Sequence, residues 1–351
     1  MKYRYLGRSG LLVSRICLGT MTFGMTNWGC DQNQASQIVD TFVGAEGNFL
    51  DTADMYSAGV SEEMTGKAIK SHNRDELVIA TKAWFRTSEG ANGSGSSRKH
   101  ILDAVEASLR RLGTDYIDLY QVHGPDWFTP MDETMRTLDD LVRQGKVRYI
   151  GCSNYYAWQM VKANSIAEKM NLEKFISAQH MYNLVRRDIE REILPACADQ
   201  GLGMLCWSPL ASGFLSGKYQ RGGDIPEGSR ISFRKNVDIP RYFHDHAFDI
   251  VETLLKLGEV TGKPPSQLST AWLLRDHRVT SVISGPKTVS QIEDVLAVAD
   301  WDLELDHWNQ LEEVSNFKHG YPLEWIDQNY GNIGGLEEFP PAHHRLVQDR
   351  N

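Results

Sequence analysis

The chain has 351 residues, of which 41% are hydrophobic and 24% charged, and it is long enough to bury a large core. Its net charge of −9 argues against nucleic acid or another polyanion as the main partner. The five cysteines form no CxxC pair or zinc-like spacing, so we expect reduced, buried thiols and no metal site. No apolar run could cross a bilayer, and arginines interrupt the first apolar residues, so we expect a soluble cytoplasmic protein without a membrane segment.

Short apolar runs rich in β-forming residues alternate along the chain with segments of helical periodicity. The runs lie at residues 13–19, 48–51, 77–82, 116–123, 147–154, 175–179, 203–209 and 279–285. Between them apolar residues recur three and four positions apart, as in Ile101, Val105, Leu109 and Leu112. Eight strands, each followed by a helix, predict a parallel sheet, because parallel neighbours need long crossover connections.

An open doubly wound sheet and a closed (β/α)8 barrel both fit this order of elements. Eight units in about 300 residues favour the barrel. No GxGxxG motif follows the first strand, and no change in composition marks a second domain. The sequence therefore predicts one α/β domain over residues 1–351, a (β/α)8 TIM barrel with long βα loops and a C-terminal tail.

Three segments depart from the regular alternation. Residues 86–98 are rich in glycine and serine, and we expect this loop to be mobile. Residues 210–243 read as a long loop with several arginines and glycines. Residues 318–351 hold aromatic residues with weak periodicity, and we expect this tail to pack on one face of the barrel.

Polar residues stand at the ends of three consecutive strands, where a barrel carries its active site. Asp51 ends the second strand and Tyr56 follows it, while Lys82 and His123 end the third and fourth strands. Because consecutive strands are neighbours, we expect these side chains to meet at one rim. Asp51 alone would more simply cap a helix, and each of the others alone has an equally simple structural role. Four such residues at adjacent strand ends favour a joint site.

Together the four residues would make a general acid. A phenol is a poor acid at neutral pH, and a Lys82 ammonium nearby would lower the pKa of Tyr56. Asp51 would keep Lys82 charged, and His123 could hydrogen-bond a substrate oxygen or help relay the proton. The set predicts proton transfer to a developing alkoxide, and by itself it does not identify a source of hydride.

The segment Asp51-Thr52-Ala53-Asp54-Met55-Tyr56 resembles the DTAxxY pattern of the aldo-keto reductase superfamily. Gly151-Cys152-Ser153-Asn154 resembles its GxSN motif, and Trp207-Ser208-Pro209-Leu210 resembles its W-S-P-L stretch. Residues 3–24 are similar to the start of the subfamily that includes bacterial general-stress reductases and potassium-channel β-subunits. The resemblance extends over most of the chain.

The resemblance implies a barrel that binds NADPH in extended form and reduces aldehydes or ketones to alcohols. It implies a catalytic tetrad of Asp51, Tyr56, Lys82 and His123, with Tyr56 as the general acid. It also implies a set of cofactor-binding residues. Those at the nicotinamide are Ser153, Asn154 and Gln179, with the ring of Trp207 stacked on it and Thr20 and Met21 on the opposite side. Those at the pyrophosphate are Ser208, Leu210, Ser212, Gly213 and Lys218, and Arg230 is expected near the 2′-phosphate. Those after the eighth strand are Gly285, Lys287, Gln291 and Asp294, and Lys287, next to a helix N-terminus, is also expected at the 2′-phosphate.

Met55, Trp84, Trp127 and Phe128 would shape an apolar pocket mouth, which suggests an aromatic or bulky aldehyde, ketone or sugar as the small-molecule partner. The oligomeric state is not predicted. Two other functions fit the same residues. One is a redox-sensing NADPH-binding regulatory protein like the channel subunits, which the intact His123 disfavours because that position is substituted there. The other is a Schiff-base lyase using Lys82, which Asp51 disfavours by keeping the ammonium charged.

Overall fold

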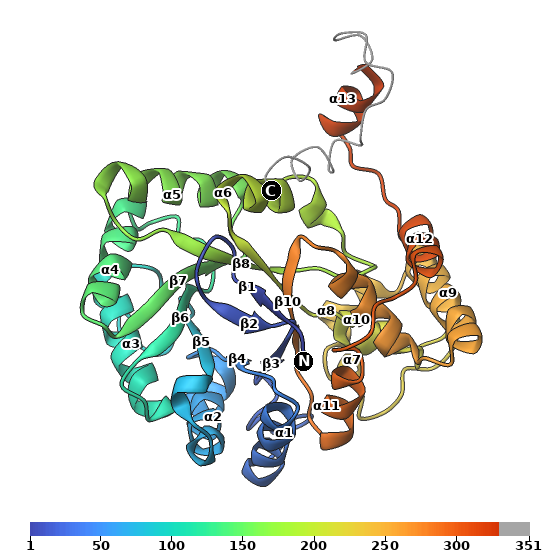
Figure 1. Cartoon of the computed structure of the whole chain (residues 1–351), viewed down its shortest axis with the longest axis horizontal. Coiled ribbons are helices and arrows are strands. Elements are labelled where there is room, and N and C mark those ends of the chain that lie inside the picture. The colour runs from blue at the N-terminus through green and yellow to red at the C-terminus, as the bar shows by residue number, and fades with distance from the viewer. Residues whose placement is uncertain (330–351) are drawn as a thin grey trace.

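The computed structural model describes residues 1–329, and their centre is a closed barrel of eight parallel strands (Figure 1). The barrel strands are β3 (Ile16–Gly19), β4 (Phe49–Asp51), β5 (Val78–Ala83), β6 (Ile117–Val122), β7 (Val147–Ser153), β8 (Phe175–Met181), β9 (Gly203–Trp207) and β10 (Val279–Ser284). They follow one another around the barrel in chain order, and β10 pairs back onto β3 to close it. The predicted single-domain (β/α)8 barrel is confirmed.

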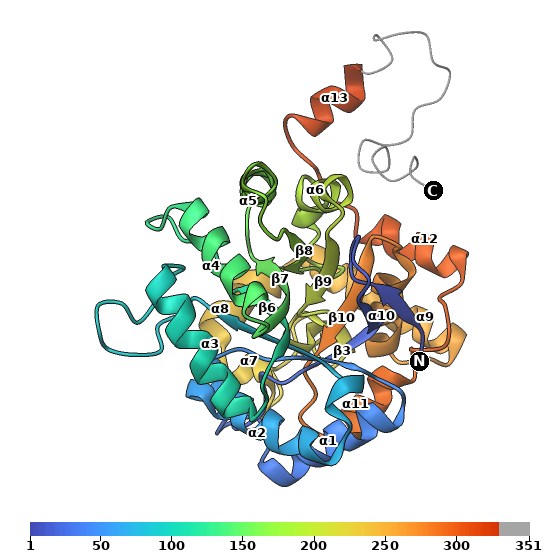
Figure 2. The same ribbon diagram turned by 60° about the vertical axis from the view of Figure 1, so that its left-hand side comes forward.

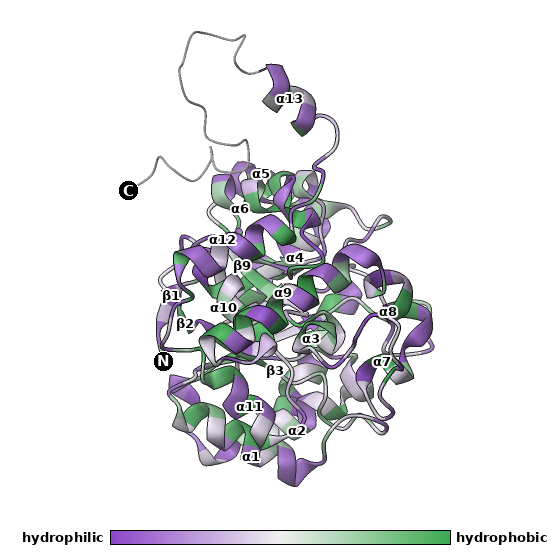
Figure 3. Cartoon of the chain, turned by 90° about the vertical axis from the view of Figure 1, so that its right-hand side faces the viewer, coloured by the Kyte–Doolittle hydropathy of each residue, from purple (hydrophilic) through white to green (hydrophobic). Residues whose placement is uncertain are grey.

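Helices surround the barrel on its outside (Figure 2). They are α1 (Gln32–Gly44), α2 (Val60–Ala68), α3 (Arg98–Leu112), α4 (Met131–Arg143), α5 (Ala157–Met170), α6 (Ile193–Gln200), α9 (Asp245–Thr261), α10 (Pro265–Arg275), α11 (Val289–Leu296) and α12 (Leu305–Val314). Helix α1 shows why they pack there. It buries Ala35, Ile38, Val39 and Phe42, which recur at helical spacing on one face. Figure 3 shows hydrophilic and hydrophobic stripes on the same helices, such as α1 and α12.

The predicted first strand, residues 13–19, is two strands separated at Arg15. Residues before the break form an antiparallel hairpin, β1 (Tyr3–Tyr5) with β2 (Leu12–Ser14), and residues after it form β3. The buried guanidinium of Arg15 bonds the Leu274 carbonyl at 2.7 Å and Asp302 at 3.2 Å. The hairpin buries Leu6 and Val13 in the cluster that fills the barrel interior, so it plugs one end of the barrel.

Residues 210–243 are not one long loop. They include a 3-10 segment, η5 (Ala211–Ser216), and two helices, α7 (Arg230–Phe233) and α8 (Lys235–Tyr242). The ring of Phe214 packs 5.9 Å from Tyr219 and 5.2 Å from Phe248, between ring centroids. This buried aromatic cluster orders a segment whose glycines and charges indicated a loop.

The Gly/Ser-rich loop 86–98 is hydrogen-bonded at its end. The Gly95 amide donates to the Trp84 carbonyl at 2.8 Å, and the Ser96 amide donates to Asp126 at 2.7 Å. The loop is thereby attached to the segment after β6, and its mobility stays a prediction.

The last described element, α13 (Leu323–Asn329), stands away from the barrel in Figures 1 and 2. Most of the expected tail, residues 330–351, lies outside the described residues, so its packing on the barrel stays a prediction. Within residues 1–329, no helix has the length and apolar character needed to cross a membrane.

Candidate active site

The ends of β4 and β5 bring an acid, an ammonium and a phenol into direct contact. Lys82 lies on β5 and is fully buried. Its Nζ donates to Asp51 Oδ2 at 2.5 Å, to the Thr52 carbonyl at 2.7 Å and to the Tyr56 hydroxyl at 3.3 Å. Tyr56 reaches this point because it opens the short turn η1 (Tyr56–Gly59) directly after the strand. The three side chains therefore form one hydrogen-bonded unit.

His123 follows β6 and completes the predicted tetrad. Its ring meets the Tyr56 ring edge-on, with centroids 5.8 Å apart and an interplanar angle of 80°. Its Nδ1 is buried and has no hydrogen-bond partner among the described residues. Burial, together with the charge of Lys82, lowers the pKa of His123 well below its usual value, so the imidazole is neutral at pH 7.

The protonation states of Lys82 and Tyr56 follow from burial and from each other. Burial disfavours the ammonium, but Asp51 and Tyr56 outweigh it and raise the pKa of Lys82. For Tyr56 burial is the larger effect and raises its pKa, while Lys82 opposes the rise. Lys82 thus lowers the pKa of Tyr56 as expected, but burial outweighs this effect and the net pKa lies above its usual value. Tyr56 keeps its proton at neutral pH.

Two glutamines hold the carboxylate of Asp51 from inside the barrel. Gln121 Nε2 donates to Asp51 Oδ1 at 3.1 Å, and Gln179 Nε2 donates to the same oxygen at 2.9 Å. Gln179 was expected at the nicotinamide, and its amide nitrogen is engaged here. Gln121 was not singled out in the sequence, although it stands near the end of β6, two residues before His123.

A second group of predicted residues gathers at the ends of β7 and β9. Asn154 Nδ2 donates to the His123 carbonyl and to Ser153 Oγ, both at 3.0 Å. Trp207 Nε1 donates to Asn154 Oδ1 at 3.2 Å. Thr20 follows β3, and its amide donates a hydrogen bond to the Asp51 carbonyl at 2.9 Å. Met21, the next residue, is half-buried. The expected nicotinamide residues thus border the tetrad.

The loop after β9 has an unusual backbone. Ser208, Ser212 and Gly213 have positive φ angles of 58°, 60° and 85°. Non-glycine residues rarely adopt this conformation, and successive backbone N–H groups in such turns form concave anion-binding sites. Leu210, half-buried, connects these residues at the start of η5.

Two lysines face this loop from different elements. A Cβ placed on Gly213 would lie 3.2 Å from Lys218 Nζ. Burial and the charge of Lys287 lower the pKa of Lys218, so the two ammonium groups share one region. Lys287 follows β10 and the exposed Gly285, and its amide donates to Gln291 Oε1 at 2.9 Å. An anion between the lysines would relieve their repulsion.

Two of the expected cofactor residues have other partners. Asp294 accepts from Ser266 Oγ at 2.7 Å and from Gln267 Nε2 at 2.8 Å, which ties α11 to α10. Arg230 lies over the ring of Trp28, with 4.8 Å from its Cζ to the ring centroid. Its Nε is buried without a partner among the described residues. Trp28 was not singled out in the sequence.

The expected substrate residues lie at different depths. Met55 and Trp84 are half-buried beside the tetrad elements, whereas Trp127 is 64% and Phe128 is 96% exposed. The last two therefore stand on the rim. Phe85, which sequence reasoning missed, places its ring centroid 4.9 Å from that of His123. Its position directly after Trp84 at the end of β5 was the available signal.

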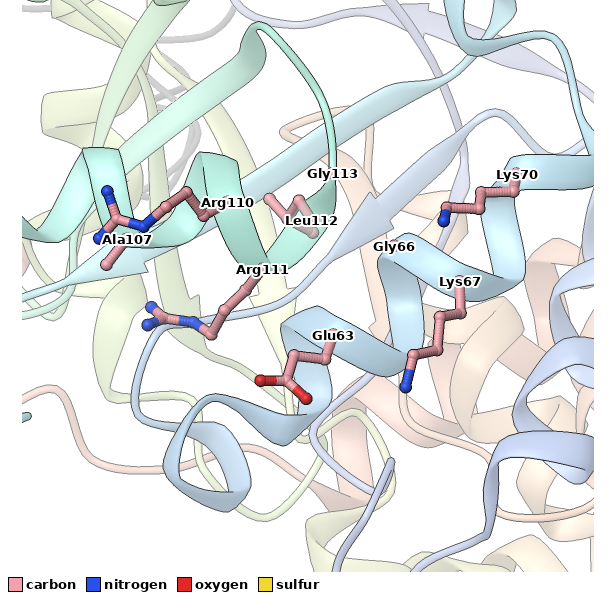
Figure 4. A pocket seen from close by; sticks show the side chains of 9 residues that line it. All are labelled: Glu63, Gly66, Lys67, Lys70, Ala107, Arg110, Arg111, Leu112 and Gly113. Atoms are coloured by element: carbon pink, nitrogen blue, oxygen red, sulfur yellow. The ribbon is translucent and has the colours of Figure 1, made fainter.

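A separate hollow of about 400 Å³ lies between α2 and α3 (Figure 4). It is lined by Glu63, Gly66, Lys67, Lys70, Ala107, Arg110, Arg111, Leu112 and Gly113. In Figure 4 the arginines of α3 and the lysines of α2 extend from opposite sides and do not converge. Lys67 and both arginines lie in the last turns of these helices, where cations complement the helix dipole. The hollow contains none of the tetrad.

Comparisons with known proteins agree with this geometry. The model of the aldo/keto reductase family matches residues 15–316. The chain is 39% identical to a putative voltage-gated potassium channel subunit beta of Schizosaccharomyces pombe, covering 92% of this chain and 94% of the relative. It is 36% identical to versiconal hemiacetal acetate reductase of Aspergillus parasiticus (89% and 96%) and 35% identical to a putative aryl-alcohol dehydrogenase of S. pombe (89% and 95%). The chain therefore belongs to the aldo/keto reductase family and is an oxidoreductase.

Proposed function

We propose that the protein is an NADPH-dependent reductase of aldehydes and ketones in which Tyr56 protonates the carbonyl oxygen. The observation that carries the proposal is the unit of Asp51, Lys82 and Tyr56, in which the ammonium donates to the phenol oxygen at 3.3 Å. Because burial raises the pKa of Tyr56, the phenol is protonated at neutral pH and has a proton to give.

The charge at this unit suits proton transfer to an alkoxide. As the Tyr56 proton leaves, negative charge develops on the phenol oxygen beside the Lys82 ammonium, which stabilises it without rearrangement. Asp51 holds that ammonium in place and is itself held by Gln121 and Gln179. A neutral His123 can donate one hydrogen bond to the carbonyl oxygen and so orient it. When bound, the nicotinamide cofactor supplies the hydride that reaches the carbonyl carbon.

The residues present fit a phosphorylated dinucleotide. The positive-φ residues after β9 offer backbone N–H groups for a pyrophosphate, and Lys218 lies close enough to Lys287 for the charge of Lys287 to lower its pKa. Arg230, whose Nε has no hydrogen-bond partner within residues 1–329, provides a third cation. Three cations favour NADPH over NADH, because only NADPH carries the additional 2′-phosphate. Ser153, Asn154 and Trp207 would hold the nicotinamide end.

The proposal is tested by Tyr56→Phe. Removing the hydroxyl removes the proton donor, so kcat with an aldehyde panel should fall by about 10²-fold or more. NADPH binding, followed by fluorescence titration, should stay within about twofold of wild type, because the ring and its packing remain. Tyr116→Phe removes a hydroxyl that donates to Asp75 outside the site, and it is the matched control. Near-normal turnover in Tyr56→Phe would refute the acid assignment.

A regulatory, redox-sensing function is the second candidate, because one relative bears the name of a channel subunit. NADPH binding without turnover of any aldehyde would favour it. The Schiff-base alternative is weaker, because Asp51 and Tyr56 raise the pKa of Lys82 and keep the amine protonated. We also infer a cytoplasmic location, on the ground that all five cysteines are buried free thiols.

A further inference from the structure

Three large aromatic side chains make contact on the outer surface. The Trp127 ring centroid lies 6.0 Å from that of Tyr156 and 6.3 Å from that of Trp158. Each of the three residues is more than half exposed. Single exposed aromatics are ordinary, but rings that contact one another in water leave a joint apolar surface. We call Trp127, Tyr156 and Trp158 the aromatic platform.

The aromatic platform lies on the same side of the barrel as the tetrad. Trp127 follows β6 four residues after His123, and Tyr156 follows β7 two residues after Asn154. Strands β6 and β7 are paired neighbours, so both segments leave the barrel at the rim that carries the acid. Trp158 occupies the first turn of α5, whose N-terminus faces that rim.

Aromatic side chains extend from the tetrad to the start of the segment that carries Trp127. Phe85 contacts His123 edge-on, and the Trp84 ring contacts Phe85 with centroids 4.8 Å apart. Trp84 in turn lies against Gly124, where an added Cβ would come within 3.2 Å of the indole. Gly124 begins the segment that ends at Trp127. A molecule longer than a simple aldehyde would therefore meet apolar surface between the reacting carbonyl and the rim.

The segment that carries Trp127 is held in place. Asp126 accepts hydrogen bonds from the amides of Ser96 and Phe128 at 2.7 and 2.9 Å and from Thr129 Oγ1 at 2.7 Å. These bonds offset its partial burial and lower the pKa of Asp126, so the carboxylate keeps the loop fixed. A ring presented by a fixed loop binds with less loss of conformational entropy than one on a free loop.

We propose that the aromatic platform is an outer subsite that binds a planar aromatic ring of the carbonyl substrate, at the end remote from the carbonyl. This inference rests on the proposed reductase function and names a substrate class for it. The three rings are tilted, with interplanar angles of 56° and 43°, so a planar guest can stack on one and meet another edge-on. The ammonium of Lys162 lies 5.9 Å from the centroid of the Trp158 ring, at the edge of the aromatic platform. This cation would also attract an electron-rich aromatic ring of the substrate.

The test uses two matched series of aldehydes. In one, a phenyl group is joined to the aldehyde by alkyl linkers of increasing length, and in the other the same linkers end without the ring. The ratio of kcat/KM between partners of equal linker length measures the contribution of the ring. In wild type this ratio should have a maximum at one linker length, where the phenyl group reaches the aromatic platform. Trp158→Ala should lower the ratio at that length about tenfold. Tyr5→Ala removes another ring that is more than half exposed, on the β1–β2 hairpin, and should leave the ratio unchanged.

Each outcome has a separate meaning. A ring preference that persists in Trp158→Ala, or that is missing in wild type while linear aldehydes are reduced, overturns this inference and leaves the reductase function intact. Failure of the wild type to reduce either series overturns the reductase function and this inference with it. If light scattering shows that wild type is a dimer and Trp158→Ala a monomer, the aromatic platform is a contact between two copies of the chain. Equal melting temperatures for Trp158→Ala and wild type establish that the variant is folded.

Discussion

The side chain of Asp54, next to the tetrad, is buried, and neither carboxyl oxygen has a hydrogen-bond partner of good geometry among the described residues. Burial, with Glu62 nearby, raises the pKa of Asp54 to about 7, and Arg111 offsets only part of this rise. In the unfolded chain the carboxyl loses its proton near pH 4. Between pH 4 and 7 the folded state thus holds a proton that the unfolded state lacks, and this contribution to stability falls as pH rises.

Replacing this carboxyl should therefore change how stability depends on pH. Relative to wild type, Asp54→Asn should gain about 2 to 3 kcal/mol of unfolding free energy between pH 5 and pH 8. Urea unfolding at the two pH values measures the difference. Asp126 is the control, because its hydrogen bonds lower its pKa and it has lost its proton in both the folded and the unfolded state by pH 5. The stability difference between Asp126→Asn and wild type should therefore be the same at pH 5 and pH 8. An Asp54→Asn difference that does not vary with pH would mean that Asp54 titrates normally in the folded protein.

The sequence predicted that the four residues of the expected tetrad lie together, but not their protonation. Strand ends in chain order are enough to place Asp51, Lys82 and His123 at one rim, because neighbouring strands of a barrel are consecutive in the chain. The pKa of Tyr56 depends instead on how much surrounding structure excludes water, and burial outweighs the adjacent ammonium. Likewise, no local pattern shows that Asp294 already has two partners on α10.

Among the elements, the β1–β2 hairpin has a structural function that can be separated from the chemistry. Gly7, with φ of 60°, lies so close to the starts of β8 and β9 that a Cβ would be 2.4 Å from the Gly201 carbonyl. The hairpin thus covers the barrel end opposite the tetrad. Leu6→Ala should cost about 2 to 5 kcal/mol of unfolding free energy, because it opens a cavity in the barrel interior.

This prediction has an internal control on the same hairpin. Leu12 is exposed, so Leu12→Ala should change stability by less than about 0.5 kcal/mol. Neither substitution should change KM, since both lie at the far end of the strands from Tyr56. Denaturant unfolding and aldehyde kinetics on both variants measure the two effects, and a changed KM in Leu6→Ala would contradict this separation.

The elements that the sequence misjudged depend on distant residues. The strand expected over residues 13–19 is divided at Arg15 because residues 12–14 pair with β1, whereas residues 16–19 pair with β4 and β10. The Arg15 guanidinium bonds Leu274 and Asp302, far along the chain. The helices α7 and α8 form in a segment that local composition assigns to a loop, because Phe214 and its aromatic neighbours bury it. The periodicity of apolar residues depends only on neighbours in the sequence. It therefore predicted the other barrel strands but not the break at Arg15 or the helices α7 and α8.

At the scale of the whole molecule, the barrel closes where β10 pairs with β3, and the expected cofactor residues extend around that closure. Lys287 follows β10, Lys218 follows β9, and Thr20 follows β3. A dinucleotide bound across these strands would connect the first and last parts of the chain. Binding to the folded state alone stabilises the entire domain, by about 2.7 kcal/mol at a ligand concentration of 100 times Kd.

This linkage predicts a measurable melting shift. For 351 residues, an unfolding entropy of about 2.1 cal/mol/K per residue gives roughly 0.7 kcal/mol/K, so NADPH at 100 times its Kd should raise Tm by about 4 °C. At the same concentration NADH should raise Tm less, since it lacks the 2′-phosphate. Lys287→Ala or Arg230→Ala should reduce the NADPH shift and leave the NADH shift nearly unchanged. The control is Lys70→Ala, in the hollow between α2 and α3, which should alter neither shift. If Lys287→Ala or Arg230→Ala reduces the shifts with NADPH and NADH equally, these cations do not contact the 2′-phosphate.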